Sequence, residues 1–421
     1  MANQRSKIAR LCDSASALKR FAKDLKCSSQ KGVDAAMELS AIILVPNDTA
    51  KTGFPLPTLL QKVYGHALLS WLSEALYADG IGRFFLVCHE QFVEQARKCL
   101  PKDAQIMTSA DSNPADLLHV FLSTADDEDV TIVAGPAIYA PSLKRWDGMT
   151  KQSCIGRASR EALMDALDDD FVFSRFLREN CAFLSDCDGC FSVDSPSALL
   201  EMGTMLRRDR ILRLMKQGVE IDDADNCRIA PSARIEPNVR ILSGSIIGED
   251  CLIRSEAVIG PWSVIEHSEI GERTVVNASQ VYRSKIGGDC MIGPYAHIRP
   301  DTVLERGVKI GNFVEVKNAH IGENTWASHL SYIGDARLGA RCNLGCGTVT
   351  VNFDRVDKHK TTVGDDAFIG CNSALIAPIT VGNGAYIAAG STVTDDVPDQ
   401  ALAICRARQT NKKDWAAKHK K

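Results

Sequence analysis

The sequence has little net charge, few aromatic residues and no long apolar run. Over 421 residues the formal net charge is −4, which gives no general basic surface and argues against a nucleic-acid partner. Phe, Trp and Tyr make up only 6% of the chain, a share that suits a core of Ile, Val and Ala. No apolar run reaches the roughly 18 residues of a membrane span, and the N-terminus shows no signal-peptide core. These absences predict a cytoplasmic protein with neither a membrane nor a nucleic-acid partner.

Cysteine is abundant, but its spacing does not predict a metal site. The chain has 15 cysteines and is too long for a small, disulfide-stapled secreted domain. Cys187 and Cys190 form one CxxC pair, and no second pair is spaced to complete a zinc ribbon. We interpret this pair as structural or incidental thiols, with its role left open. The sequence predicts no metal ligands.

Aliphatic residues recur at every sixth position through the second half of the chain. Seven consecutive members stand six apart, and two later runs resume the count after interruptions. A small residue, such as Ala233 or Ser245, stands two positions before most of them. The aliphatic members are Ile229, Ile235, Ile241, Ile247, Ile253, Ile259 and Ile265, then Ile286, Ile292, Ile298, Leu304 and Ile310, then Val363, Ile369, Leu375, Val381, Ile387 and Val393.

A period of six fits neither an α-helix nor one long strand. It fits short strands that alternate with turns, which is the pattern of hexapeptide repeats in parallel β-helices. Three hexads per coil predict about 18 residues per coil, stacked at about 4.8 Å. Cys227, Cys251, Cys290 and Cys342 occupy the small inward position, so we expect them in the core. An ordinary β-sandwich with chance spacing is the alternative.

An α/β region precedes the repeats. Apolar strand-like runs at 41–45, 84–87 and 130–133 alternate with helical patterns such as 59–76, which predicts a mostly parallel sheet. Gly218 is the expected stop of the helix that leads into the repeats. The predicted parts are a helical extension (1–38), an α/β domain (39–196), a connecting helix (197–220), a β-helix (221–405) and a basic tail (406–421).

Four dense motifs lie within the repeats and between them. They read HIRP at 297–300, VKIGNFVEVK at 308–317, SHLSYIGD at 328–335 and NLGCGT at 343–348. With the domain order, they resemble the bifunctional N-acetylglucosamine-1-phosphate uridyltransferase/glucosamine-1-phosphate acetyltransferase family. The resemblance implies a nucleotidyltransferase-like (Rossmann-like) α/β domain followed by a left-handed parallel β-helix. It also implies a homotrimer with sites at the subunit boundaries.

The resemblance implies acetyl transfer from acetyl-CoA to the 2-amino group of glucosamine 1-phosphate, a step towards UDP-N-acetylglucosamine and the bacterial cell wall. His329 matches the general base, because a neutral imidazole accepts a proton near pH 7. The positions that match the sugar-phosphate site are Arg299, Lys317, Tyr332, Asn343, Asn352 and Lys358. The positions that match the acetyl-CoA site are Cys346, Cys371, Ala389 and Arg406.

The largest interruption of the repeats, between Thr350 and Val363, is expected to project cations from a smooth prism. A site on a solenoid requires such a loop, because regular coils present flat faces. Two positions depart from the family pattern: Cys371 stands where Ser is usual, and Phe353 stands where Tyr is usual. We expect both departures to weaken contacts without removing the base.

The nucleotide apparatus of the α/β domain is degraded at four places. Residues 45–53 read VPNDTAKTG where the family has a glycine-rich phosphate loop, and Pro46 removes a backbone donor. Pro57-Thr58 replaces a Pro-Lys pair, and Asn113-Pro114 replaces a Gly-Thr pair. Residues 134–136 read AGP where a metal-binding Asp is expected, which leaves Asp194 as a single carboxylate. The resemblance therefore implies lost uridyl transfer, with Mg²⁺ required only if that site is still active.

Two other functions remain open at this point. The chain could be the full bifunctional enzyme with a divergent loop that still binds UTP, or a non-catalytic trimeric scaffold. The acceptor could be the free sugar phosphate or a UDP-sugar, and the contacts of residues 1–38 are not indicated by the sequence.

Overall fold

The computed structural model describes residues 39–111, 114–144, 151–167, 171–193 and 195–419. The expected helical extension over 1–38 lies outside these residues. The chain divides into two compact units, with the division between Leu206 and Arg207. Within the described ranges, no helix combines the length and the apolar character that a membrane span requires.

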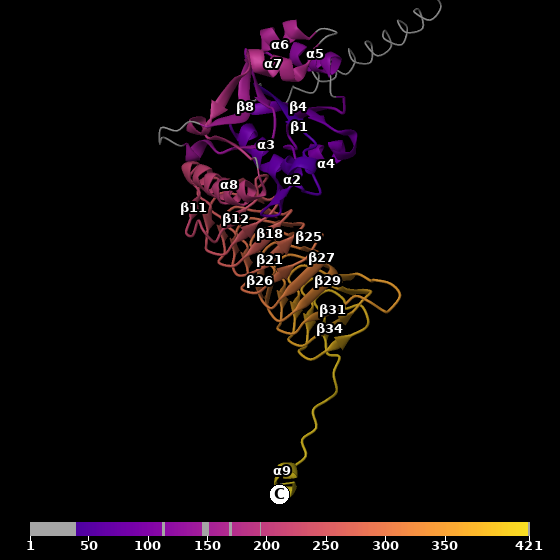
Figure 1. Cartoon of the computed structure of the whole chain (residues 1–421). Helices are drawn as coiled ribbons and strands as arrows, with labels where there is room; N and C mark the ends of the chain where they lie inside the picture. Colours follow the sequence, from indigo (N-terminus) through magenta and orange to yellow (C-terminus); the bar gives the residue numbers. More distant parts are fainter. Residues whose placement is uncertain (1–38, 112–113, 145–150, 168–170, 194, 420–421) are drawn as a thin grey trace, which may run out of the picture. The chain divides into compact units, whose positions relative to one another are not determined.

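The first unit is built on a six-stranded sheet in the order β5-β4-β1-β6-β8-β9 (Figure 1). The neighbours among β5, β4, β1 and β6 pair in parallel, whereas β8 and β9 are antiparallel to their neighbours. The predicted mostly parallel sheet is confirmed. The strands are β1 (Leu39–Val45), β4 (Ile81–Cys88), β5 (Gln105–Ser109), β6 (Asp129–Val133), β8 (Gln152–Ser159) and β9 (Ala182–Ser185).

Both faces of this sheet are covered, because successive side chains of a strand point to opposite faces. On β1, Ile43 joins the core that contains Leu68 and Leu72, whereas Ile42 joins the core that contains Phe121 and Leu163. The remaining helices and strands of the unit are α2 (Thr49–Thr52), β2 (Lys62–Val63), β3 (His66–Ala67), α3 (Leu68–Ala78), α4 (Val93–Arg97), α5 (Ala115–Ser123), β7 (Ala137–Tyr139), α6 (Arg160–Ala166), α7 (Phe173–Asn180) and β10 (Cys190–Ser192).

The helix expected over 59–76 is wrong in its first half. A short 3₁₀ turn at Thr58–Leu60 is followed by the β2–β3 hairpin, and α3 begins only at Leu68. Tyr64 and Gly65 form the hairpin turn with positive φ values of 51° and 90°, a conformation that ends helical geometry. The apolar spacing matched a helix there because the buried residues of the turn and hairpin happen to share it.

Helix α8 (Pro196–Lys216) ends two residues before Gly218, its predicted stop. Gly218 has a φ of 89°, and the N–H of Val219 donates to the carbonyl of Leu214 at 3.1 Å, which is a glycine-dependent helix end. The division between the two units falls inside this helix rather than at either expected boundary.

The second unit is a left-handed parallel β-helix, as predicted. Its strands run from β11 (Glu220–Ile221) to β38 (Leu402–Ala403) and form an 11-stranded and a 17-stranded sheet (Figure 1). The hexad aliphatics and the four inward cysteines all lie in one continuous core. The strands that carry the site are β24 (His297–Ile298), β26 (Lys309–Asn312), β27 (Glu315–Ile321), β28 (Trp326–His329), β29 (Tyr332–Leu338), β30 (Asn343–Leu344), β31 (Val349–Val351), β32 (Thr361–Val363), β33 (Phe368–Ile369) and β36 (Tyr386–Ile387).

The expected coil of 18 residues holds for only part of the β-helix. Ile241 pairs with Ile259 18 positions on, but Ile259 pairs with Val276 after 17 and Val276 with Ile292 after 16. The shorter coils lose residues at turns, where no inward side chain is needed. Their strands therefore stay in register and the core stays filled.

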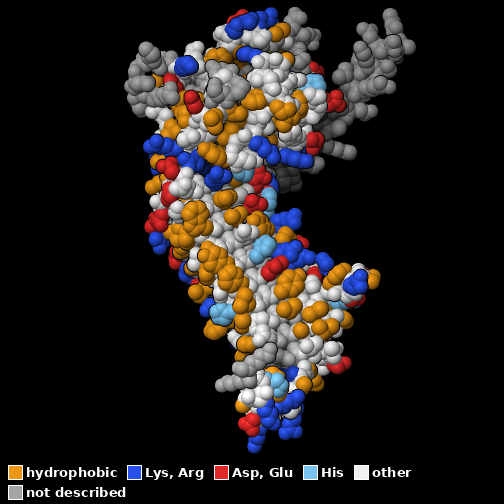
Figure 2. Space-filling view, turned by 60° about the horizontal axis from the view of Figure 1, so that its bottom comes forward, with side chains coloured by type: hydrophobic (Ala, Val, Ile, Leu, Met, Phe, Trp, Pro, Cys, Tyr) orange, Lys and Arg blue, Asp and Glu red, His pale blue; other side chains and the backbone are white. Residues whose placement is uncertain are grey.

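One edge of the β-helix carries exposed apolar side chains, here called the apolar edge. Its members are Trp262, Tyr295, Phe313 and Leu330, which are between 57% and 69% exposed and have φ values near +50°. The N–H of Phe313 donates to the carbonyl of Tyr295, and their rings stack with centroids 5.6 Å apart. Figure 2 shows hydrophobic side chains gathered on the surface of the solenoid.

Candidate active site

Arg299 and Lys317 lie side by side on neighbouring coils. Strands β24 and β27 pair in register, which places residue 299 opposite residue 317. Arg299 Nη1 lies 2.7 Å from Glu315 Oε1, so the carboxylate orients the guanidinium. Both partners of this ion pair are more than a third exposed, and the fork of Arg299 stays accessible to a planar anion.

Tyr332 reaches the same face from the next coil. Strand β29 pairs with β27, so that Lys317 faces Gly334. The hydroxyl of Tyr332 lies where a Cβ of residue 334 would be, so only a glycine at this position avoids a clash with it. The phenol of Tyr332 is thereby held over the backbone beside Lys317.

The projecting loop adds a second ammonium to this face. Its side-chain contact with Lys317 and the like charge of that ammonium lower the pKa of Lys358, whereas the carboxylate of Asp335 raises it. A phosphate would relieve the repulsion between two ammonium groups held this close together. We call Arg299, Lys317, Tyr332 and Lys358 the cationic face.

The loop is held in shape by its own hydrogen bonds. Phe353 and Lys358 form an antiparallel bridge, and Asp354 Oδ1 accepts from the N–H groups of Val356 (2.8 Å) and Asp357 (2.7 Å). Contact with His359 and these N–H groups lowers the pKa of Asp354. Leu344 and Ile369 pair 25 positions apart, so the predicted loop occupies the largest interval between paired coil residues in this part of the β-helix.

Asn352 anchors this loop and is not open to solvent. It is 8% exposed, and its amide donates to Asp335 Oδ2. Asn318 Nδ2 donates to the other carboxylate oxygen at 2.5 Å. The carboxylate of Asp335 thus ties the base of the loop to the preceding coils through Asn352, the position expected to contact the sugar.

His329 ends β28 at the edge of the β-helix, where it is exposed. Its Nδ1 lies 2.7 Å from Asn312 Oδ1, because the two residues face each other in register. An amide oxygen only accepts, so this contact places the imidazole proton on Nδ1 and leaves the lone pair of Nε2 free. The motifs did not single out Asn312, although the 17-residue interval to His329 identifies it once the coil length is known.

Three of the predicted acetyl-CoA positions follow His329 along the same edge, and the fourth, Arg406, comes directly after them. His329, Cys346, Cys371, Ala389 and Cys405 occupy equivalent turn positions on successive coils, and we call them the turn column. The N–H of Asn372 donates to the carbonyl of Cys346 at 2.7 Å, and that of Gly390 to the carbonyl of Cys371 at 2.8 Å. Arg406 follows the column directly, with its Cδ 3.7 Å from where a Cβ of Gly390 would lie.

Asn343 belongs to neither group. It lies on β30, where it pairs with Trp326 of β28 and Phe368 of β33, on the sheet that leads into the turn column. One chain therefore presents a cationic face on one sheet and a turn column at an edge, with Asn343 on the sheet between turns.

The loop at 45–53 of the first unit is closed on itself. Asp48 Oδ1 accepts from the N–H of Thr58 at 2.9 Å, and the carbonyl of Asp48 accepts from the N–H groups of Lys51 and Thr52. The side chain of Asp48 and a four-residue helix, α2, occupy the turn after β1, and the amides of Asp48, Lys51, Thr52 and Gly53 bond to carbonyls of the loop itself. A carboxylate in this turn disfavours a bound phosphate.

Residues 134–136 bring no side-chain ligand to the expected metal position in the first unit. Ala134, Gly135 and Pro136 have no side-chain oxygen, and Asp194 and Asn113 lie outside the described residues. Where residues are described, no group of three or more His, Cys, Asp or Glu side chains could hold a metal ion. Cys190 is a buried free thiol, and burial raises its pKa to about 12; Cys187 is also free.

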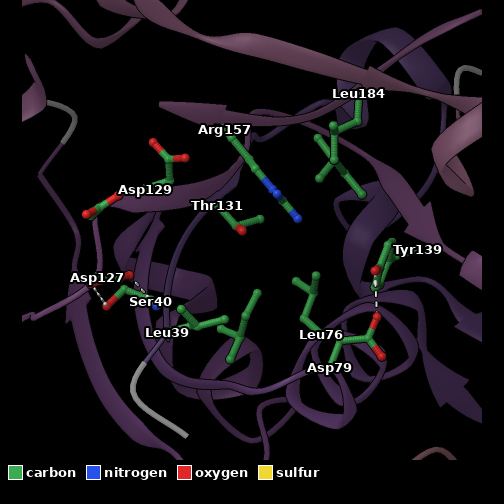
Figure 3. Close-up of a pocket in the computed structure, with 13 residues that line it drawn as sticks. Leu39, Ser40, Leu76, Asp79, Asp127, Asp129, Thr131, Tyr139, Arg157 and Leu184 are labelled. Carbon is green, nitrogen blue, oxygen red and sulfur yellow. Dashed lines mark hydrogen bonds between the residues drawn. The ribbon is translucent and has the colours of Figure 1, made fainter. Parts of the chain in front are cut away.

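A pocket of about 380 Å³ lies at the amino ends of the parallel strands of the six-stranded sheet (Figure 3). Leu39, Ile81 and Asp129 line it from the first residues of β1, β4 and β6, while Arg157 comes from β8. Ligands of open α/β sheets bind at the carboxyl ends of the parallel strands. This pocket lies at their amino ends, so it is not the nucleotide site that the fold would provide, and no motif in the sequence indicated it.

A family model described as bacterial transferase hexapeptide (six repeats) matches residues 226–261, 283–318 and 360–395. These segments lie within the β-helix, whose repeats are therefore similar to the hexapeptide repeats of bacterial transferases.

Among curated proteins, the bifunctional protein GlmU of Bacillus velezensis is 54% identical over 224 residues, which is 53% of this chain and 49% of that protein. The GlmU of Listeria welshimeri is 41% identical over 278 residues, 62% of this chain and 60% of that protein. The resemblance to bifunctional GlmU proteins is confirmed over about half of the chain, and the chain spans about half the length of the relatives it matches. The loss of uridyl transfer stays a prediction.

A solved structure of an Arabidopsis UDP-N-acetylglucosamine acyltransferase is 21% identical. The match covers 41% of this chain and 70% of that one, with a TM-score of 0.28.

Proposed function

We propose that this protein transfers the acetyl group of acetyl-CoA to the 2-amino group of glucosamine 1-phosphate. The observation that carries this proposal is the cationic face, where Lys358 of the loop meets Lys317 beside Arg299. A phosphate relieves the repulsion between these cations, and Tyr332 lies beside them for a sugar hydroxyl.

His329 is the proposed general base. Its free Nε2 takes the proton from the amine as nitrogen attacks the thioester carbonyl, and Asn312 holds the ring in the required tautomer. Collapse of the tetrahedral intermediate expels the coenzyme A thiolate. Acetyl-CoA supplies the activated acetyl group, and the turn column with Arg406 would hold it.

The catalytic unit is proposed to be a homotrimer. The apolar edge is exposed in the single chain, and a second copy would cover it. The cationic face and the turn column come from different sides of the β-helix, so a neighbouring copy brings them together at a subunit boundary. A cytoplasmic location remains a prediction.

The first unit is proposed to have lost uridyl transfer. The support is the closed loop at 45–53, where Asp48 places a negative charge at the turn that would have to receive UTP phosphates. Incubation with N-acetylglucosamine 1-phosphate, UTP and Mg²⁺ tests this proposal. Pyrophosphate release at ordinary enzymatic rates would establish the bifunctional alternative instead.

Product mass spectrometry tests the acetyltransferase itself. The full chain is mixed with acetyl-CoA and glucosamine 1-phosphate, and we expect N-acetylglucosamine 1-phosphate to form. UDP-glucosamine in a parallel reaction distinguishes a nucleotide-linked acceptor. Formation of neither product above the no-enzyme rate would favour a non-catalytic scaffold.

A further inference from the structure

Two members of the turn column are cysteines that face each other on neighbouring coils. Leu344 pairs with Ile369 and Val349 pairs with Ala374, each 25 positions on, so the intervening turn places Cys346 opposite Cys371. The backbones touch there. A Cβ built on Gly345 would lie 2.5 Å from the nitrogen of Cys371, and the N–H of Asn372 donates to the carbonyl of Cys346 at 2.7 Å.

This placement meets the distance that a disulfide requires. Neighbouring coils stack at about 4.8 Å, and cysteines joined by a disulfide have Cα atoms roughly 4.4 to 6.8 Å apart. Both thiols are free, with Cys371 exposed and Cys346 partly exposed. The next cysteine of the column, Cys405, is separated from Cys371 by the coil of Ala389, about two spacings or ~9.6 Å away, which is too far for a bond.

The cysteines of the hexad core differ from this pair in their exposure to solvent. Cys251 and Cys290 are buried at the inward position, and burial raises the pKa of each to about 11. Reactive thiols require access to solvent and to their partner. In the part of the β-helix that the structure describes, the turn column provides both.

We propose that Cys346 and Cys371 form a thiol-pair modification site that reacts with low-molecular-weight disulfides, RSSR. The thiolate of the exposed Cys371 attacks one sulfur of RSSR, which forms a mixed disulfide and releases RS⁻. The thiolate of Cys346 then attacks the Cys371 sulfur, forms the Cys346–Cys371 disulfide and releases the second RS⁻. Two protein thiols are oxidised and one RSSR is reduced to two RSH, so electrons and protons balance.

The consequence for activity rests on the proposed function. The turn column begins at His329 and is the proposed seat of acetyl-CoA, so a covalent bridge between two of its members removes both thiols from the surface that the coenzyme contacts. Oxidation is therefore expected to stop acetyl transfer reversibly, and a reducing thiol restores it.

The chemical step is tested without reference to activity. The reduced full chain is incubated with glutathione disulfide, blocked with N-ethylmaleimide, and digested for peptide mass mapping. We expect a peptide pair joined through Cys346 and Cys371 in the wild type and in Cys405→Ser. In Cys346→Ser, a stable glutathione adduct on Cys371 is expected instead. A wild type that gains only glutathione adducts, or a cross-link between other cysteines, overturns the proposal.

The functional step is measured as the ratio of oxidised to reduced activity within each variant. In the wild type and Cys405→Ser we expect acetyl transfer to fall at least tenfold on oxidation and to recover with dithiothreitol. The double variant Cys346→Ser/Cys371→Ser, compared with its own untreated form, should not respond. A mapped cross-link with an unchanged rate overturns the inhibitory role. A reduced protein with no acetyl transfer overturns the proposed function, and the peptide map still decides the thiol pair.

Discussion

Two loops that interrupt regular structure differ in how their charged groups are paired. The loop at 45–53 of the α/β unit satisfies itself: Asp48 bonds to Thr58, and neighbouring amides bond within the loop. The loop at 352–360 of the β-helix is equally well ordered at its base, but it leaves Lys358 against Lys317. A loop whose polar groups hydrogen-bond to each other needs no ligand. A loop that holds two cations together is stabilised when an anion binds between them.

The largest expected effect comes from His329→Ala in the β-helix. Loss of a general base should lower kcat by about 10² to 10⁴-fold, with little change in KM for either substrate. Initial rates of product formation measure it, with exposed His267→Ala as the matched control. A loss of less than about threefold would remove His329 from the reaction.

Removal of either lysine of the cationic face should weaken sugar-phosphate binding. For Lys317→Met and Lys358→Met we expect KM for glucosamine 1-phosphate to rise about 10- to 100-fold, since a charge-assisted hydrogen bond contributes about 1.5–3 kcal/mol. The KM for acetyl-CoA should stay unchanged. Lys285→Met, at an exposed lysine 3.5 Å from Glu269, is the control.

The same pair gives a pH prediction with a definite sign. The pKa of Lys358 is lower in the folded protein than its ordinary value of 10.5. At a pH below the folded-state pKa the charged ammonium therefore destabilises the fold, and this destabilisation fades as the pH rises from the folded-state pKa towards 10.5. Lys317→Met should move the pKa of Lys358 upward, and so should added phosphate. NMR titration of lysine labelled at Cε follows both, and an unmoved Lys358 resonance would contradict the pairing.

Asn312 acts through His329, so a smaller effect is expected there. Asn312→Ala should lower kcat about fivefold, which corresponds to one hydrogen bond of about 1 kcal/mol. Asn312→Asp keeps an acceptor for Nδ1–H and should recover most of the rate. Equal loss in both variants would indicate a structural role instead.

In the loop at 45–53 of the α/β unit, Asp48→Ala should affect stability alone. The lost bond to Thr58 is expected to reduce the free energy of unfolding of its unit by about 0.5–1.5 kcal/mol. Acetyl transfer should be unchanged. Chemical denaturation followed beside exposed Asp103→Ala measures the difference, and a change in acetyl transfer would show that the loops are not independent.

The repeats made the β-helix predictable, because every sixth side chain must enter one core. Ile298 and Leu375 lie there as expected. The same rule could not give the coil lengths, since a turn such as that before Val276 shortens without moving any inward residue. Asn312 was missed for this reason, because its partnership with His329 depends on an interval of 17 rather than 18.

Motif matching named candidate site residues but could not indicate their surroundings. It did not indicate that Asn352 is buried against Asp335, where its amide holds the base of the loop. It also could not indicate the pocket at the amino ends of β1, β4 and β6, which is formed by side chains distant in sequence. In the α/β unit, the pattern at 59–76 predicted the wrong element because helical spacing also fits a short turn followed by a hairpin.

The placement of the long loop has an evolutionary consequence. Pairings 25 positions apart occur on each side of it, from Ala336 with Thr361 to Val349 with Ala374, so the inserted residues alter none of the flanking strands. In a solenoid each coil contacts only its neighbours. The loop can therefore be exchanged without disturbing the neighbouring coils. If the proposed function holds, acceptor preference can then diverge among descendants while the turn column is inherited unchanged.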